Sequence, residues 1–506
     1  MKIASKLGLS GVGVAPLACV ASRCKGLDEQ PDFASPDAFF RNESEMIAGI
    51  NGVYRPLNQQ WFNTYYNRSV FDCALGITGG YEKGPQYYKQ GAYVSGDEYI
   101  IAYWRDNYDG INRANVILEK LPSLSKDAIS DATRKRISGE AHFLRALYIY
   151  QLYVYFENIA VPTEPTRGLG VFPSNEGGKA KALETMIVDL KAAETDLAAT
   201  DATGRPTKWA AKTLLAKVHL EAGQWQAAAD KAKEVIDQSG LTLFADFNDN
   251  FNPAKENQGE RLFEVQNNFE KSPWENYNNM HAHYTPTDWD GGNPNTLEKG
   301  DGNTAAGWAD AWIVGDTKFR ALFDNTDKRI QATFMEQYRS KNANGDVVRY
   351  DPAAKSPFVA PNSPDRTYNN VIIQKFIEYN IGGWQNTKKN YILLRLADAY
   401  LAHSEACANG ATGNATLGIN TVRQRAGLPP VTATGAALKD AVFWEWMREF
   451  AGEAWAFPTA RRFNKTAEVI KQFTGRTVDN NKFRVLPLPL VEVDANKNIK
   501  QNEGWQ

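Results

Sequence analysis

The sequence is short of three things: a surplus of either charge, cysteine, and long apolar runs. Lysine and arginine number 57 and aspartate and glutamate 59, which gives a net charge of −2. Proteins that bind nucleic acids by displacing counterions carry a basic face, so this balance argues against that class. With 43% hydrophobic and 23% charged residues, the composition is that of a globular protein rather than a disordered or multispanning one.

One apolar segment lies at the N-terminus. Lys2 and Lys6 precede a stretch of small and apolar residues, 7–21. No other segment approaches the roughly 18 unbroken apolar residues of a membrane-spanning helix. This arrangement predicts an export signal. The alternative is a terminal helix, which the glycines and Pro16 within the segment disfavour.

Cysteine is scarce, and two of the four cysteines lie at the end of this signal. That position predicts a bacterial lipoprotein, in which an acylated cysteine begins the mature chain. We expect Cys24 to be this residue, with residues 1–23 removed; the alternative is Cys19, which follows a small residue. Acyl chains contribute about 0.8 kcal/mol per buried CH₂ and can hold the mature chain, 24–506, at a bilayer.

Motifs for nucleotide and zinc-protease chemistry are missing: there is no Gly-x-Gly-x-x-Gly, no phosphate-binding Gly-Lys-Ser/Thr loop and no His-Glu-x-x-His. His281 and His283 form a His-x-His pair without a nearby third ligand. We expect these histidines to lie at the surface or contact a ligand, and we expect no metal or cofactor. Cys73 and Cys407 could form a disulfide, but we expect two separate buried thiols.

Helical periodicity is clear in three segments. Apolar residues recur every three or four positions over 137–156. Residues 209–236 form two helical runs around Gly223, with small residues spaced as in tetratricopeptide helix pairs. A related pair covers 391–425. The sequence therefore predicts a mainly α fold built from such pairs.

The rest of the sequence contains weaker predicted helices and loop-rich regions. The loop-rich regions are dense in Asn, Asp, Gly, Pro and aromatics with little sustained period, so we expect long loops with short helices or strands there. The weaker helices are expected at 100–121 and 437–455, the whole scaffold at about 100–240 and 390–456, and the loop-rich regions at about 58–96 and 248–385.

Aromatic side chains crowd into the longer loop-rich region. Flat rings can stack on the C–H face of a sugar, while amides and carboxylates bind its hydroxyls. We therefore expect exposed rings here to bind a carbohydrate, with roughly two or three of six touching the ligand and the others anchoring the loops. The six are Trp274, Tyr277, Tyr284, Trp289, Trp308 and Trp312.

Because carboxylates lie among these rings, an enzyme is an alternative to a binding protein. A glycoside hydrolase needs two carboxylates that face each other across the scissile bond, and Asp288, Asp290 or Asp310 could serve. Carboxylates in loops are more often solvated or bonded to a sugar hydroxyl, so we expect Asp288 to bind ligand and expect no catalysis. A helical scaffold that binds only other proteins is the third reading.

Four blocks of the sequence resemble the SusD/RagB family of outer-membrane nutrient-binding lipoproteins of Bacteroidetes. Together they span nearly the whole chain. They are 24–31; 139–148 with 155–156 and 161–162; 391–401 with 405–406 and 419–428; and 485–505.

The resemblance implies a right-handed scaffold of tetratricopeptide-like helix pairs and a loop-rich half that bears the ligand site. It implies no enzymatic activity. It suggests an outer-membrane lipoprotein, facing the cell surface, that captures oligosaccharides or polysaccharide for a partner SusC-type TonB-dependent transporter. Some members of the family bind calcium, although no motif fixes a calcium site in this sequence.

Ligand residues transfer poorly within the family, because they lie in its variable loops. By position, Arg68, Tyr81 and Trp308 fall where the family binds ligand, whereas the other aromatic candidates rest on chemistry alone. The family's C-terminal pattern is only partly present: Glu445, Glu449 and Glu453 fit it, but Pro458 and Thr459 do not. We expect Pro458 to interrupt a helix and Thr459 to lack the ion pair of the usual aspartate.

Overall fold

The structure is a computed structural model of the whole chain. The described residues are 39–58, 64–80, 83–168, 170, 172–267, 280–286, 289–302, 313–341, 347–349, 358–359, 367–368, 370–382 and 387–506. The chain divides into two compact units, Met1–Phe40 and Arg41–Gln506, and the fold belongs to the second. The expected signal, 1–23, and Cys24 lie outside the described residues.

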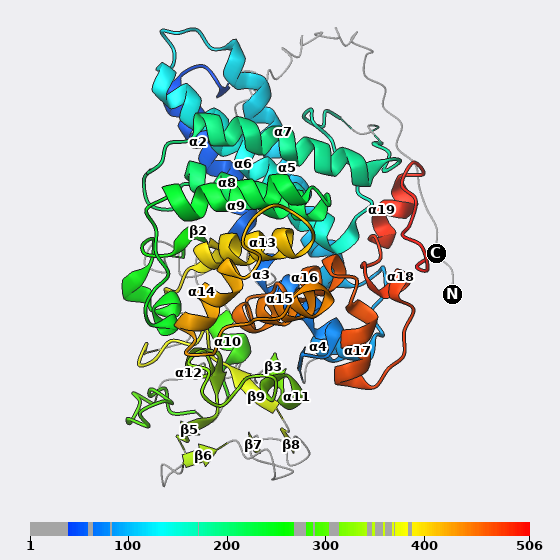
Figure 1. The fold of residues 1–506 in the computed structure, drawn as a ribbon. Helices are drawn as coiled ribbons and strands as arrows, with labels where there is room; N and C mark the ends of the chain where they lie inside the picture. Colours follow the sequence, from blue (N-terminus) through cyan, green and yellow to red (C-terminus); the bar gives the residue numbers. More distant parts are fainter. Residues whose placement is uncertain are drawn as a thin grey trace, which may run out of the picture. The chain divides into compact units, whose positions relative to one another are not determined.

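The scaffold is a series of helices in which each packs against the next. α5 packs on α6, α6 on α7, α7 on α8 and α8 on α9, while α13 packs on α8, α9, α14 and α15. Figure 1 shows α6 to α9 and α13 lying side by side. The predicted mainly α fold of helix pairs is confirmed. The bounds are α2 Glu43–Tyr54, α5 Glu98–Lys120, α6 Asp131–Phe156, α7 Gly178–Asp196, α8 Lys208–Glu221, α9 Trp225–Gln238, α13 Leu396–Ala408, α14 Leu417–Arg425 and α15 Gly435–Glu449.

Helix α6 lies at the centre of this series. It begins where the Ser130 side chain accepts a hydrogen bond from the Thr133 backbone N–H at 3.3 Å, which caps the first turn. From Phe143 to Phe156 every residue is buried, on all sides of the helix. A helix that is buried all round needs neighbours on every face, and α5, α7, α8 and α16 (Ala456–Arg462) supply contacts.

The segment 391–395 is not the start of a helix, as its periodicity had suggested, but a strand. β10 (Tyr391–Arg395) pairs antiparallel with β2 (Arg261–Val265), and both strands are fully buried. Short apolar runs such as this one cannot be assigned to helix or strand by period alone. Helix α13 begins directly afterwards, because the Asp398 carboxylate accepts the Arg395 backbone N–H at 2.9 Å and caps it.

The helix expected over 437–455 ends early, at Glu449, and a second helix, α16 (Ala456–Arg462), follows. Pro458 lies in the first turn of α16, where its missing N–H removes no intrahelical bond. It therefore does not interrupt a helix. Thr459 donates its hydroxyl to the Trp455 backbone carbonyl at 2.8 Å and forms no ion pair.

The described part of 248–385 consists of short strands and helices joined by loops, as predicted. Its main sheet, which also includes β1 from the region 58–96, has the order β1-β3-β9-β4, with every neighbouring pair antiparallel. The strands are β1 Thr78–Gly79, β3 Val314–Asp316, β4 Phe334–Met335, β9 Asn370–Ile373, and the pairs β5 Gln337–Arg339 with β6 Val347–Arg349 and β7 Phe358–Val359 with β8 Thr367–Tyr368. The helices are η4 Phe247–Phe251, η5 Pro253–Lys255, α10 Met280–Tyr284, α11 Thr317–Arg320 and α12 Ile330–Thr333.

Short helices also occupy the region around 58–96 and the C-terminal segment. Cys73 and Cys407 are separate buried thiols, as expected. Within the described residues, no helix is both long and apolar enough to cross a membrane. The remaining elements are η1 Arg55–Asn58, α3 Thr64–Asp72, η2 Cys73–Leu75, α4 Lys83–Gln90, η3 Leu121–Ser123, α17 Thr466–Thr474, α18 Asn480–Phe483 and α19 Leu490–Ala495.

Candidate functional site

Two of the rings expected to face a sugar are buried. Tyr284 and Trp289 are each 1% exposed, so the prediction that they form an open stacking surface is wrong. The Tyr284 ring stacks on Phe376 with centroids 5.9 Å apart. The Trp289 indole donates its N–H to the Gly292 carbonyl at 3.0 Å. Both rings thus hold loops onto the body, the role that we expected for only part of the set.

Arg68 is also buried, at 1% exposure. Its guanidinium lies 3.9 Å from the centre of the Trp455 ring and donates to the Ala454 carbonyl at 2.8 Å. These contacts join α3 to the turn before α16. A guanidinium over an indole gains a cation–π interaction when both are desolvated. Arg68 therefore stabilises the fold and offers no group to a ligand at the surface.

The His281 and His283 pair lies inside the protein rather than at its surface. Burial lowers the pKa of both histidines to about 3, so both rings are neutral at ordinary pH. Nδ1 of His281 accepts the Glu378 backbone N–H at 3.1 Å. These histidines are 1% and 7% exposed, so the expectation that they lie at the surface is wrong, while contact with a ligand stays a prediction.

The other predicted site residues cannot be placed in the same way. They lie outside the described residues, and their roles stay predictions: Tyr81, Trp274, Tyr277, Asp288 and Trp308, with Trp312 and Asp310 beside them.

The described residues do form a hollow of their own, which we call the amide groove. It consists of two adjoining cavities of about 800 and 580 Å³ that share Asp246, Asn248, Asn295 and Gln331. Volumes of this size are typical of ligand sites. Three walls enclose it: the η4–η5 segment, the loop after Trp289, and a third wall of residues 325–337 around α12 with residues 374–379 after β9 and Lys389.

The η4–η5 wall is built by side-chain caps. The Asp246 carboxylate accepts the Asn248 backbone N–H at 2.9 Å, and the Asn252 amide oxygen accepts the Ala254 N–H at 3.0 Å. Such caps are how Asp and Asn favour short turns. The two turns direct Phe247 and Phe251 inward, where their rings meet edge to face with centroids 5.5 Å apart. The wall therefore has a polar rim above an apolar base.

The loop after Trp289 is closed by Asp290. Its carboxylate accepts the N–H groups of Gly292 at 2.9 Å and Gly300 at 3.1 Å, and pairs with Arg339 at 3.2 Å. A Cβ atom on either glycine would lie 2.0 Å from a backbone oxygen, so the two strands of the loop can approach only because both residues are glycine. The loop presents Asn295 to the groove. Because the carboxylate of Asp290 is engaged in this way, Asp290 is a poor candidate for a hydrolase acid.

The third wall carries a half-buried aromatic ring, Tyr379, which the sequence analysis did not single out. Its hydroxyl donates to the Gln374 side chain at 3.5 Å, and its ring meets Trp289 edge to face with centroids 6.1 Å apart. Gln374 donates to the Phe334 carbonyl at 3.1 Å. A partly exposed ring beside amides is the combination expected of a sugar contact.

Eight residues of the described lining carry side-chain amides. Each amide offers two N–H donors and a carbonyl acceptor, so it can match a hydroxyl group that both donates and accepts. Asn295 and Gln331 are exposed, and their side-chain amides hydrogen bond to no other residue of the described chain. These two amides are available to a ligand. The amides of the lining belong to Asn248, Asn252, Asn293, Asn295, Asn325, Gln331, Gln337 and Gln374.

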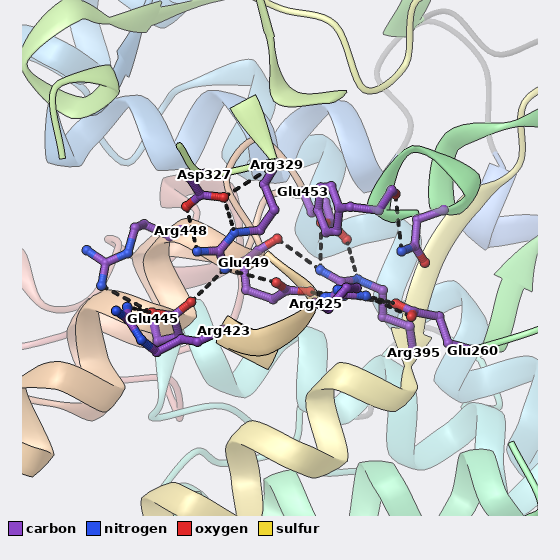
Figure 2. Close-up of polar contacts among 12 residues, drawn as sticks. Glu260, Asp327, Arg329, Arg395, Arg423, Arg425, Glu445, Arg448, Glu449 and Glu453 are labelled. Carbon is purple, nitrogen blue, oxygen red and sulfur yellow. Dashed lines mark hydrogen bonds and ion pairs between the residues drawn. The ribbon is translucent and has the colours of Figure 1, made fainter. Parts of the chain in front are cut away.

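A buried ion-pair network includes the groove residue Asp327 (Figure 2). Asp327, a groove residue, pairs with Arg329 at 2.7 Å, and Arg329 pairs with Glu445 at 2.6 Å and Glu449 at 3.0 Å. Glu449 in turn pairs with Arg395 and Arg425. The Arg425 guanidinium lies 4.9 Å from the centre of the Phe247 ring at the base of the groove. The network therefore connects the groove to helix α15.

Guanidinium groups determine the charge state of this network. Burial alone would raise the pKa of Glu449, but the guanidiniums of Arg425, Arg395 and Arg329 outweigh it and hold that pKa well below its ordinary value of 4.5. Glu449 is 0% exposed and stays ionised. The sequence contained a signal for this network, since Glu445 and Glu449 recur at helical spacing, but their burial could not be predicted from it.

Family models match both halves of the chain. The model of the SusD family matches residues 233–505, and a model described as "Starch-binding associating with outer membrane" matches residues 25–220.

Three full-length relatives have similar sequences. Two SusD-like proteins of Formosa agariphila are 25% identical over 538 residues and 24% identical over 513 residues, with 94% and 95% of this chain and 95% and 96% of the relatives covered. A SusD-like protein of Bacteroides ovatus is 25% identical, with 84% of this chain and 77% of the relative covered.

Solved structures share the fold. A laminarin-binding SusD-like protein superposes with a TM-score of 0.74 at 24% identity, covering 92% of this chain and all of its own. Surface glycan-binding protein A of Bacteroides thetaiotaomicron, in complex with laminarihexaose, has a TM-score of 0.71 at 18% identity, with 91% and 99% covered. Family models and relatives together span nearly the whole chain, which therefore belongs to the SusD family.

Proposed function

We propose that this protein binds glycans at the cell surface and delivers oligosaccharides to a SusC-type TonB-dependent transporter. The observation that carries the proposal is the amide groove, a ligand-sized and hydroxyl-matching hollow in a chain of the SusD family. Two structural neighbours named for laminarin or laminarihexaose support it.

The attachment to the membrane belongs to the same proposal. Cys24 carries the acyl chains, which hold the protein at the outer membrane facing outward. The family model's description, with its reference to the outer membrane, supports this location. Binding needs no cofactor in this proposal; a loss of affinity in a chelator would instead indicate calcium.

Aromatic residues outside the described part remain the proposed stacking contacts. Trp274, Tyr277, Trp308 and Tyr81 supply rings, and Asp288 supplies a hydrogen-bond acceptor. The two alternatives, a glycoside hydrolase and a scaffold without ligand, predict different outcomes in the same experiment.

We expect the mature protein, with Cys24→Ser to prevent acylation, to be retained in a gel that contains laminarin, without releasing reducing ends overnight. Trp274→Ala and Trp308→Ala should each weaken binding about tenfold or more, because a stacked ring is lost, with the melting temperature unchanged. Affinity electrophoresis and calorimetry against a panel of polysaccharides measure this.

The matched control is Phe172→Ala, which removes an exposed ring, 53% accessible, that lines neither cavity. It should leave affinity unchanged. Release of reducing ends would support the hydrolase. Absence of binding to every glycan in the panel would refute the proposed function, and full affinity in both tryptophan variants would refute these two contacts.

A further inference from the structure

The charges that line the amide groove are unevenly arranged. Among the described residues of the lining, the carboxylates belong to Asp246, Asp249, Asp327, Glu336 and Glu378, and the only cations are Lys328 and Lys389. The two cavities have no arginine in their described lining. Proteins bind sulfate, phosphate and carboxylate groups preferentially through the planar fork of arginine. The described residues of the lining do not include that group.

One of the two lysines is directed away from the groove. Lys389 is only 8% exposed, and its ammonium donates to the backbone carbonyls of Ile377 at 2.6 Å and Lys375 at 3.2 Å. Its charge is therefore used inside the protein. Lys328 is exposed and remains the one cation at the surface of the described lining.

The carboxylates divide in a similar way. Asp327 is paired with Arg329, and Glu336 with Arg320 at 2.6 Å. The guanidinium groups therefore compensate the negative charges of these two carboxylates. Asp246 is exposed and Asp249 half-buried, and no cation pairs with either of them among the described residues. An anionic ligand would meet these two negative charges and one lysine.

We propose that the amide groove selects uncharged oligosaccharides and discriminates against glycans that carry uronate or sulfate groups. This inference rests on the proposed glycan-binding function and adds the charge class of the ligand. The amides of Asn295 and Gln331, which both cavities share, bind hydroxyl groups. The carboxylates of Asp246 and Asp249 repel anionic substituents.

The test compares laminarin oligosaccharides with oligogalacturonates of the same length and with sulfated agar oligosaccharides, using calorimetry on the Cys24→Ser protein. The uncharged ligand should bind at least about tenfold more tightly than either charged one. Its affinity should change less than about twofold between low and high salt, because no ion pair contributes to binding.

Asn295→Ala and Gln331→Ala should each weaken laminarin-oligosaccharide binding about five- to tenfold with an unchanged melting temperature, since neither amide bonds within the described structure. The control, Gln238→Ala, removes an exposed amide at the end of α9, away from the groove lining, and should have no effect. Asp249→Lys should strengthen oligogalacturonate binding and so narrow the affinity ratio between laminarin oligosaccharides and oligogalacturonates.

The outcomes separate this inference from the function on which it rests. Tight binding of a charged glycan that weakens steeply with salt would overturn the charge class and leave glycan binding intact. Full laminarin affinity in both amide variants would overturn the groove as the site, while the loop tryptophans could still bind. If no glycan of any charge binds, the proposed function itself fails.

Discussion

Trp289 shows how one side chain can shape the groove without touching a ligand. Its indole N–H is bonded to the Gly292 carbonyl, and its ring lies between His281 and Tyr379, with centroids 6.2 and 6.1 Å away. Both the loop closed by Asp290 and the ring of Tyr379 thus depend on Trp289. A residue expected to bind sugar instead positions two walls of the groove.

We expect Trp289→Ala to destabilise the protein by about 3–5 kcal/mol, the usual cost of deleting a large buried ring. Urea denaturation, followed by fluorescence or circular dichroism, measures this. Trp289→Phe keeps most of the packing and loses the hydrogen bond, so it should cost about 1–2 kcal/mol. An unchanged urea midpoint in Trp289→Ala together with lost glycan binding would restore this ring as a ligand contact.

At the scale of elements, α15 connects the scaffold to the groove. Its Glu449 lies between three guanidiniums, those of Arg329, Arg395 and Arg425, whose side chains are at most 4% exposed. Arg395 ends strand β10, and Arg425 ends helix α14. One carboxylate on α15 therefore joins β10, α14 and the N-terminus of α12. Buried ion pairs are costly to break singly, because the remaining charges lose their partner.

Glu449→Gln should destabilise the fold by about 3–5 kcal/mol, because it leaves buried guanidiniums without their shared counter-charge. Asp440→Asn is the matched control on the same helix: Asp440 pairs with Lys465 at 2.8 Å but is 50% exposed, and such surface pairs contribute at most about 1 kcal/mol. Equal melting temperatures for the two variants would show that the buried network does not hold the fold.

Across the whole molecule, buried carboxylates of two kinds determine the dependence of stability on pH. Burial opposes ionisation of Glu157, but Arg461 and Arg484 outweigh it and lower the pKa to about 2. The pKa values of Glu445, Glu449 and Glu453 are likewise lowered. These four groups stabilise the fold above pH 4.5, and that contribution is lost as the pH falls. Burial raises the pKa of Asp72 to about 7, so the effect of Asp72 on stability as the pH changes has the opposite sign.

We therefore expect the free energy of unfolding to be greatest in mildly acidic buffer and to fall steeply below about pH 4.5. Between pH 3.8 and 7 the folded protein holds a proton on Asp72 that the unfolded chain has released, so Asp72 lowers stability as the pH rises through this range. Urea midpoints from pH 3 to 8 measure both trends. Asp72→Asn should flatten the upper slope, and a constant midpoint down to pH 3 would contradict the network's role.

The sequence by itself determined the helix pairs, the charge balance that argues against a nucleic-acid binder, and the family. Each of these follows from local periodicity, composition or ordered blocks of residues, which a single chain displays directly. For the amide groove, the sequence indicated only a region rich in Asn and aromatics. A sequence pattern does not show which amides lie close together in the folded chain.

Only the tertiary structure decided which rings and charges are buried. Arg68 lies over Trp455, and Trp289 meets Tyr379, through contacts between residues far apart in the chain. Strand β10 exists because Tyr391–Arg395 finds a partner in β2. Burial and pairing depend on which residues pack against a side chain. A tryptophan can therefore bind a sugar or hold a loop in place, and the packing around Trp289 makes it hold the loop.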